Sequence, residues 1–123
     1  MVPRPKHEVA RDHLGLARAD IEAGDERGAV SALFYAAEAL VALAEVHGID
    51  TKRDHRRKAD AASAMHANGA LDSDFGPLFK ELNQQRKDVW YAGQPPDFGE
   101  FGLSDVADEM ESPVRAAEAA VGA

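Results

Sequence analysis

The residues best suited to chemistry lie near the end of an apolar helical stripe in the C-terminal half. Apolar side chains recur there at helical spacing (Phe75, Leu78, Phe79, Leu82, Val89 and Trp90), and Arg86 falls between Leu82 and Val89. A 3.6-residue period predicts an apolar side chain at position 86, whereas the chain has a guanidinium there. Arginine keeps its charge in proteins, so a buried arginine needs an ion-pair partner, a stacking surface or a hydrated cleft. Arg86 is therefore either a structural ion-pair anchor or the centre of a site.

Three other residues are expected to accompany Arg86. Trp90 follows it by four residues, shares its helix face and is expected to stack on the guanidinium. Glu38, on an earlier helix, is our first choice of counter-charge. Tyr91 lies about 140° around the helix from Arg86, so the two side chains converge only if the helix frays near Gly93 or a second subunit supplies its own copy.

Metal and cofactor chemistry finds no support in the spacing of the remaining residues. The five histidines (His7, His13, His47, His55 and His66) form no metal-binding pattern, and there is no cysteine. We therefore predict no metal site and no cofactor.

Charge is unevenly distributed along the chain. The net charge of −8 argues against a general nucleic-acid binder, because a polyanion is repelled on average. Residues 52–58 nevertheless hold five bases against one acid, including Arg53, Arg56 and Arg57. This run is either a solvated helix start or a patch that contacts a phosphate or an acidic partner.

Helical periodicity extends over the whole chain, with Gly and Pro clusters between the helices. Helices are predicted over about 6–23, 25–48, 54–67, 74–93 and 103–121, and no strand is predicted. The sequence predicts an all-α, antiparallel bundle of four to five helices. We expect a single domain over residues 1–123, with a core of about 6–93 and one or two C-terminal helices over about 103–121.

Two features of the C-terminal part leave alternatives open. Phe98 and Phe101, in the Pro/Gly loop 94–102, either cover the end of the bundle or dock a partner. Ser112-Pro113 either kinks one helix or separates two short ones, because serine followed by proline is also typical of a helix start. Tyr35, beside Phe34, is expected in the core with its hydroxyl at the rim.

The segments that direct a chain to a membrane or out of the cell are not evident. The N-terminal residues contain no apolar run typical of a signal peptide, and no stretch of roughly 18 apolar residues suggests a membrane span. With no cysteine, the sequence favours a soluble, cytoplasmic protein that does not contact membranes.

Several motifs follow one another in an order typical of one superfamily. They are Gly24-Asp25, Ser31, the run from Phe34 to Leu40, Asp54-His55-Arg56, Leu82, Arg86 and Tyr91. In this order and spacing the chain resembles the HEPN superfamily, small all-helical domains of prokaryotic toxin–antitoxin systems that also occur beside nucleotidyltransferases. The resemblance covers residues 8–93. It implies a bundle that dimerises, with the Arg86 position near the dimer interface, and a nucleotidyltransferase or antitoxin protein as partner.

One departure from the superfamily pattern affects the expected function. In its ribonuclease members the arginine is followed, after four to six residues, by a histidine, whereas this chain has Tyr91, Ala92 and Gly93 in that window. RNA cleavage needs a base for the 2′-hydroxyl proton and a cation for the phosphorane charge, and tyrosine, with a pKa near 10, is a poor base. We therefore expect a homodimeric binding or regulatory module without ribonuclease activity, which uses Arg86, Trp90, Tyr91 and the 52–58 run.

Two alternatives remain. The first is a metal-independent ribonuclease toxin that binds RNA and uses Arg86 with Tyr91 or His55 across a dimer; in related toxins a tyrosine near this position accepts a nucleotidyl group. The second is a purely structural dimer in which Arg86 only pairs with Glu38.

Overall fold

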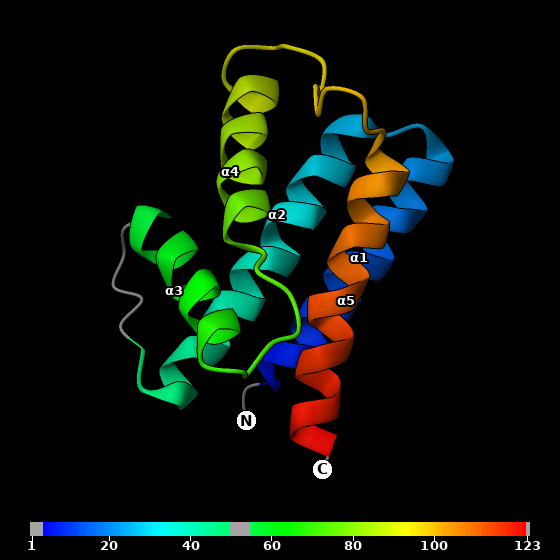
Figure 1. Cartoon of the computed structure of the whole chain (residues 1–123). Coiled ribbons are helices and arrows are strands. Elements are labelled where there is room, and N and C mark those ends of the chain that lie inside the picture. The colour runs from blue at the N-terminus through cyan, green and yellow to red at the C-terminus, as the bar shows by residue number, and fades with distance from the viewer. Residues whose placement is uncertain (1–3, 50–54, 123) are drawn as a thin grey trace.

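The computed structural model describes residues 4–49 and 55–122, which form a bundle of α-helices (Figure 1). The elements are α1 (Lys6–Ala23), α2 (Glu26–Ala42), the short 3₁₀ helix η1 (Leu43–His47), α3 (His55–Ala67), α4 (Gly76–Trp90) and α5 (Leu103–Gly122). Within the described ranges there is no strand, only an isolated bridge between Phe98 and Phe101. The predicted all-α bundle is confirmed.

A two-residue connection holds α1 antiparallel to α2. Gly24 adopts a left-handed conformation with φ 78°, which ends α1 where the sequence predicts. The Asp25 side chain then accepts a hydrogen bond of 2.9 Å from the Gly28 backbone N–H and caps α2. Because the connection is so short, α1 and α2 pack along each other and form the largest contact between two elements.

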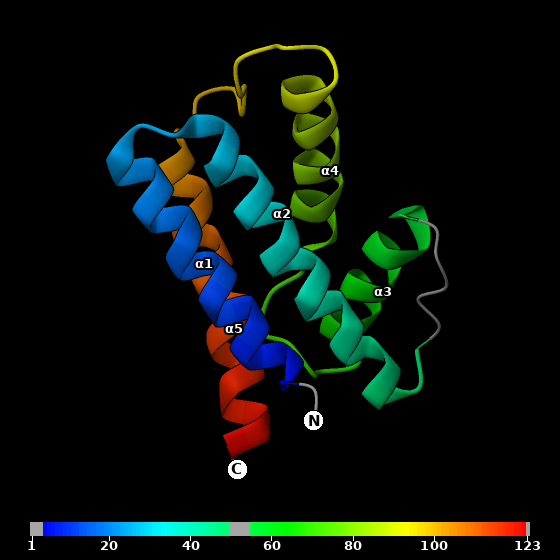
Figure 2. The same cartoon turned by 180° about the vertical axis from the view of Figure 1, so that it is seen from behind.

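Helix α2 is the central element of the bundle and contacts α1, α3, α4 and α5 (Figures 1 and 2). Its α-helical part ends at Ala42, earlier than predicted, and the chain continues as η1 to a left-handed Gly48. By length and composition, residues 26–45 are apolar enough to cross a membrane, so the expectation that no such stretch exists is wrong. In this bundle 56% of that segment is buried, as suits a core helix.

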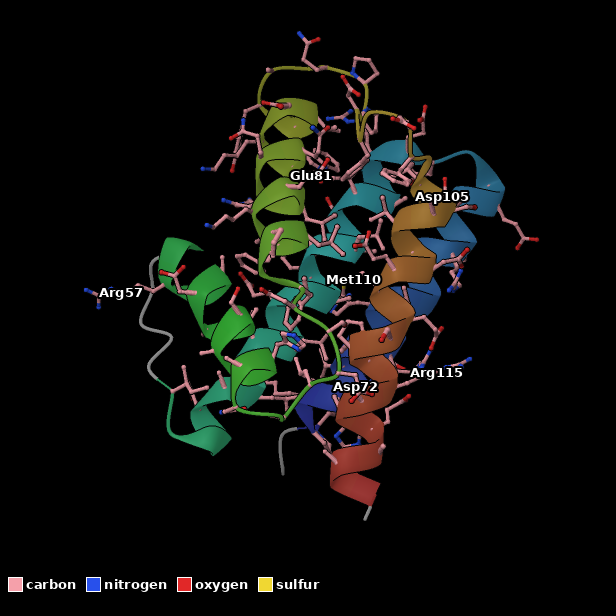
Figure 3. All side chains as sticks on the ribbon, viewed as in Figure 1. Arg57, Asp72, Glu81, Asp105, Met110 and Arg115 are labelled. Atoms are coloured by element: carbon pink, nitrogen blue, oxygen red, sulfur yellow. The ribbon has the colours of Figure 1, made fainter. Side chains whose placement is uncertain are left out.

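Helix α5 packs against α1 and α2 and completes the core. Val106, Met110 and Val114 on its inner face are almost fully buried, and Met110 can be followed in Figure 3. The helix runs without a break through Pro113, itself buried, so Ser112-Pro113 does not separate two helices. Proline removes one helical hydrogen bond, but packing of the buried residues on both sides of Pro113 maintains the helix.

Helix α3 lies close to the start of α4. A Cβ atom at Gly76 would lie 2.3 Å from the Ser63 hydroxyl and 2.7 Å from the Ala59 carbonyl oxygen, so only glycine permits this approach. The Asp74 carboxylate accepts hydrogen bonds from the Ser63 hydroxyl at 2.7 Å and the Gly76 N–H at 2.8 Å. These contacts fix the start of the helix that carries Arg86.

The connection from α4 to α5 closes one end of the bundle. Phe98 is buried in the core, whereas Phe101 is exposed, so only Phe98 covers the bundle end. The Gln85 side chain accepts a hydrogen bond of 2.8 Å from the Asp97 N–H and ties this loop to α4.

Candidate functional site

One face of α2 is not covered by any other helix. In Figure 2 it lies between α1 on one side and α3 and α4 on the other. Its residues share helical spacing and at least partial exposure, and the spacing continues into η1 with Glu45. We call this set the α2 stripe: Arg27, Ser31, Tyr35, Glu38, Ala42 and Glu45. The stripe begins beside the C-terminal end of α4, which carries the predicted site residues.

A hollow of about 320 Å³ lies where the α2 stripe meets the end of α4. Ser31 and Tyr35 line it from α2, and Arg86, Trp90 and Tyr91 line it from the end of α4. We call it the Arg86 hollow. It brings together three of the residues predicted from sequence with Ser31 and Tyr35 of the superfamily-like motif.

Arg86 is partly buried and has no carboxylate partner among the residues that the structure describes. Its guanidinium carbon lies 4.4 Å from the centre of the Phe34 ring, and its Nη2 donates a hydrogen bond of 2.9 Å to the Asn83 side-chain oxygen. Its Nε is buried without a hydrogen-bond partner in the described part of the chain. The stacking surface expected for this cation is therefore present, but the counter-charge is not.

Trp90 does not stack on Arg86, contrary to expectation. The cation above its ring is Arg27, at the start of the α2 stripe, whose guanidinium carbon is 4.1 Å from the ring centre. The spacing of four correctly places Trp90 and Arg86 on one face of α4. The start of α2 lies beside the Trp90 ring, however, and Arg27 occupies the position over the ring. Trp90 remains 46% exposed at the rim of the hollow.

Glu38 is not the counter-charge of Arg86 within this chain. Its Oε2 accepts a hydrogen bond of 3.3 Å from the Lys58 ammonium on α3, which forms an ion pair. Its other oxygen, Oε1, accepts no hydrogen bond from the described residues. The expected pair fails because α3 brings a nearer cation to Glu38.

Tyr91 reaches the Arg86 hollow because α4 ends just before it. The helix ends at Trp90, three residues earlier than predicted, and the Tyr91 N–H still donates a bond of 2.9 Å to the Lys87 carbonyl. Tyr91 keeps helical backbone angles as the C-terminal cap of α4, and it lines the same hollow as Arg86. Tyr91 is 79% exposed.

The basic run is only partly described. Arg53 and the side chains of His55 and Arg56 lie outside the described residues, so their expected roles stay predictions. Arg57 is exposed and projects away from the bundle in Figure 3. Lys58 binds Glu38.

A second hollow, of about 300 Å³, lies on the other side of Tyr35 along the α2 stripe. Lys6, Val9 and His13 line it from α1, Tyr35, Glu38 and Glu45 from the α2 stripe, and Lys58 from α3. We call it the Glu38 hollow. The His13 and Tyr35 rings are in contact, with centres 5.7 Å apart. Tyr35, expected in the core, is instead 46% exposed and separates the two hollows.

Sequence reasoning missed Arg27 and His13 as neighbours of this surface. Arg27 could have been found, because it precedes Ser31 and Tyr35 at spacings of four and eight. His13 gave no signal, because its proximity to Tyr35 depends on the packing of α1 against α2.

The seam between α1 and α5 contains a dense set of ion pairs. Arg11 donates hydrogen bonds of 2.6–3.0 Å to both Glu111 and Glu118, and Arg18 binds Asp108 at 3.0 Å. The bonds from Arg11 lower the pKa of Glu111 from 4.5 to about 2 against the opposing effect of burial, and they also lower the pKa of Glu118. Bonds to Glu118 and Glu111 raise the pKa of Arg11 in turn.

No group of three or more histidine, aspartate or glutamate side chains that could hold a metal ion occurs in residues 4–49 and 55–122. Comparisons of the chain with protein-family models, with curated proteins and with solved structures found no match.

Proposed function

We propose that this chain is a HEPN-like, dimeric binding or regulatory module in which the Arg86 hollow receives an anionic group of a partner. The single observation that supports this most is Arg86, a partly buried cation without an ion-pair partner among the described residues. A carboxylate or phosphate in the hollow would supply the counter-charge that the described residues do not provide.

The side chains around Arg86 suit recognition. Trp90, Tyr35 and Tyr91 are exposed at the same hollow, and a second guanidinium, Arg27, lies over Trp90. Tryptophan, tyrosine and arginine are the residues most enriched among those that dominate binding energy at protein interfaces. We therefore propose a protein partner, a nucleotidyltransferase or another component of a toxin–antitoxin module, in the cytoplasm.

The absence of a histidine at 91–93 supports binding over catalysis. Arg86 is suited to hold a phosphate or carboxylate, but no imidazole follows it in the chain to accept a proton. The module is proposed to act by binding to its partner.

The test measures binding of a fluorescent oligo-glutamate peptide by anisotropy. Arg86→Met is expected to weaken binding about tenfold, because one charge-assisted hydrogen bond is lost. Arg115→Met is the matched control, since it removes the same charge from an exposed position on α5. Equal affinity of both variants and the wild type would overturn the assignment of the site.

A metal-independent ribonuclease is the second candidate, favoured by the convergence of Tyr91 and Arg86 on one hollow. A base, Tyr91 or His55 across a dimer, would take the 2′-hydroxyl proton, and the 2′-oxygen would form a bond to phosphorus. The bond from phosphorus to the 5′-oxygen would break, leaving a 2′,3′-cyclic phosphate, and the 5′-oxygen would take up a proton. Arg86 would stabilise the negative charge of the phosphorane. A mixed RNA pool is incubated with purified protein in the presence of a chelator. Cleavage that disappears in Arg86→Ala would replace the binding module by a ribonuclease, and intact RNA with both proteins would support the binding module.

A further inference from the structure

The Glu38 hollow has the size and position of a site for a small molecule. It is lined from α1, α2 and α3, and in Figure 2 the C-terminal half of α2 passes between the start of α1 and α3. Its volume of about 300 Å³ is at the lower end of the range of ligand pockets, roughly 300–1,000 Å³. Two of its lining residues, Ala39 and Ala42, have short side chains that leave this space open. The hollow therefore suits a molecule of about the size of an amino acid.

An ion pair in this hollow has hydrogen-bonding groups to spare. Glu38 Oε2 is 3.3 Å from the Lys58 ammonium, whereas Glu38 Oε1 accepts no hydrogen bond from the described residues. An ammonium has three N–H donors, and only one of those of Lys58 has a partner within residues 4–49 and 55–122. A free acceptor and free donors thus lie side by side at the same hollow.

The charges that line the hollow are equal in number. Lys6 and Lys58 contribute two ammonium groups, and Glu38 and Glu45 contribute two carboxylates. A ligand with a net charge would be attracted by one set and repelled by the other, whereas a zwitterion can place each of its charges beside the opposite one. The Glu38–Lys58 pair sets the spacing, because its two atoms are only 3.3 Å apart. The ligand's ammonium and carboxylate must be equally close, as they are on the single α-carbon of an amino acid.

An apolar surface accompanies these charges. Val9, Ala39 and Ala42 line the hollow with aliphatic groups. The rings of His13 and Tyr35, whose centres are 5.7 Å apart, line it as well. Aliphatic carbon atoms placed against these side chains are removed from water, which is favourable. The lining therefore favours an amino acid with an aliphatic side chain.

We propose that the Glu38 hollow binds a free aliphatic α-amino acid. The carboxylate of the amino acid accepts a hydrogen bond from the Lys58 ammonium, and its ammonium donates one to Glu38 Oε1. Its side chain packs against Val9 and Ala39. Two further pairs of opposite charge then form beside the pair that is already present, and the hydrogen-bonding groups left over by the chain are used.

This site is separate from the one in the proposed function. Among the described lining residues, Tyr35 alone is common to the Glu38 hollow and the Arg86 hollow. Neither charged group that holds the amino acid lines the Arg86 hollow. The amino-acid site therefore stands or falls independently of recognition at Arg86.

The first test titrates the isotope-labelled protein with L-valine and L-leucine and follows the backbone amide signals by NMR. We expect a dissociation constant of about 1 mM or lower for at least one of them. The largest shifts are expected at Val9, Ala39 and Lys58, which lie on three different helices around the hollow. No shift with either amino acid, or shifts centred elsewhere in the bundle, would overturn the inference.

Three analogues of leucine test the need for two adjacent charges. Isocaproate lacks the ammonium, isoamylamine lacks the carboxylate, and ε-aminocaproate is an isomer of leucine with its charges at opposite ends. Each is expected to bind about tenfold more weakly than leucine, because at least one charged hydrogen bond is lost. An analogue that binds as tightly as leucine would overturn the assignment to an α-amino acid.

Substitutions of the ion pair test the residues that hold the ligand. Glu38→Gln and Lys58→Met each remove one charge and are expected to weaken the binding of leucine about tenfold. Glu109→Gln on α5 and Lys80→Met on α4 make the same changes at exposed positions and are the matched controls, with unchanged affinity expected. Equal affinity in all four variants would overturn the inference.

A larger side chain in the hollow tests the same site without changing a charge. Ala42→Leu fills the space at a partly exposed position, and both residues are good helix formers, so the fold is expected to persist by circular dichroism. Leucine binding is expected to weaken more than about tenfold, whereas Ala119→Leu, at an exposed position on α5, leaves it unchanged. A folded Ala42→Leu variant that binds leucine as the wild type does would overturn the inference. If this variant does not fold, Glu38→Gln and Lys58→Met decide the question.

Discussion

Partly buried arginines occur at two places in this bundle, and their surroundings differ. On the α1–α5 seam, Arg11 donates hydrogen bonds to two carboxylates, Glu111 and Glu118. At the Arg86 hollow, Arg86 contacts a phenyl ring and an amide oxygen, and its buried Nε finds no hydrogen-bond partner within residues 4–49 and 55–122. Both arginines lie between helices, but only Arg11 is fully compensated by its own chain.

The difference separates structural from functional use of the same side chain. An arginine that is paired with carboxylates of another helix holds the two helices in register. Its removal is unfavourable, because the carboxylates lose their counter-charge. A cation without a counter-charge adds little to folding and is retained at a cost unless it binds something. The comparison predicts that substitutions in the seam change the free energy of unfolding, whereas substitutions in the α2 stripe change binding.

The largest expected effect lies beneath the seam. Met110→Ala removes a fully buried side chain from the inner face of α5 and is expected to lower the free energy of unfolding by about 2–4 kcal/mol. Tyr91→Ala, at the exposed rim of the hollow, is expected to change it by less than about 0.5 kcal/mol. Urea denaturation followed by circular dichroism measures both. Equal losses would remove the distinction between the two regions.

A smaller loss is expected when the seam cation is removed. Arg11→Met leaves Glu111 and Glu118 close together without their shared donor and should cost about 1–2 kcal/mol of unfolding free energy. In high salt the same experiment should give a smaller difference in unfolding free energy between Arg11→Met and the wild type, because salt screens exposed ion pairs. A variant as stable as the wild type would show that the seam pairs are not structural.

Acid should weaken the seam selectively. The folded-state pKa of Glu111 is lowered from 4.5 to about 2, so its contribution is fully present above pH 4.5 and is lost as the pH falls towards 2. The unfolding free energy of the wild type is therefore expected to fall more steeply over this range than that of Arg11→Met. Parallel curves would contradict the assignment of this pH dependence to Arg11.

The smallest expected effect on stability is at Arg86. In Arg86→Met the unpartnered nitrogen disappears and an apolar side chain remains against Phe34, so the unfolding free energy of the monomer should stay within about 0.5 kcal/mol of the wild type or rise. Denaturation at low protein concentration keeps dimer effects small. A loss above about 2 kcal/mol would make Arg86 a structural residue like Arg11.

Local signals made much of the fold predictable. The limits of α1 follow from its apolar spacing and from Gly24, whose left-handed conformation and neighbour Asp25 end one helix and start the next. Pro113 shows where local rules fail. The hydrogen bond that proline removes destabilises the helix and can be inferred from the sequence. Burial of Pro113 against the core stabilises the helix, but this contact depends on the tertiary structure.

The helix face on which the site residues lie could be predicted from the sequence, but the contacts of these residues could not. Periodicity placed Arg86 on the inner side of α4, where it is partly buried. Its partners depend on how α2 and α3 are rotated and offset beside α4, so Phe34 lies under Arg86 and Lys58 reaches Glu38 first. Helical spacing specifies which residues share a face, and the packing of neighbouring helices specifies what they meet.

The position of Trp90 gives this surface an optical signal of its own. It is the only tryptophan in the chain, and it stands 46% exposed at the rim of the Arg86 hollow beneath Arg27. All tryptophan fluorescence therefore originates at the proposed contact surface. A molecule that covers the α2 stripe would remove water from the indole and move its emission to shorter wavelength, so association can be followed without any label.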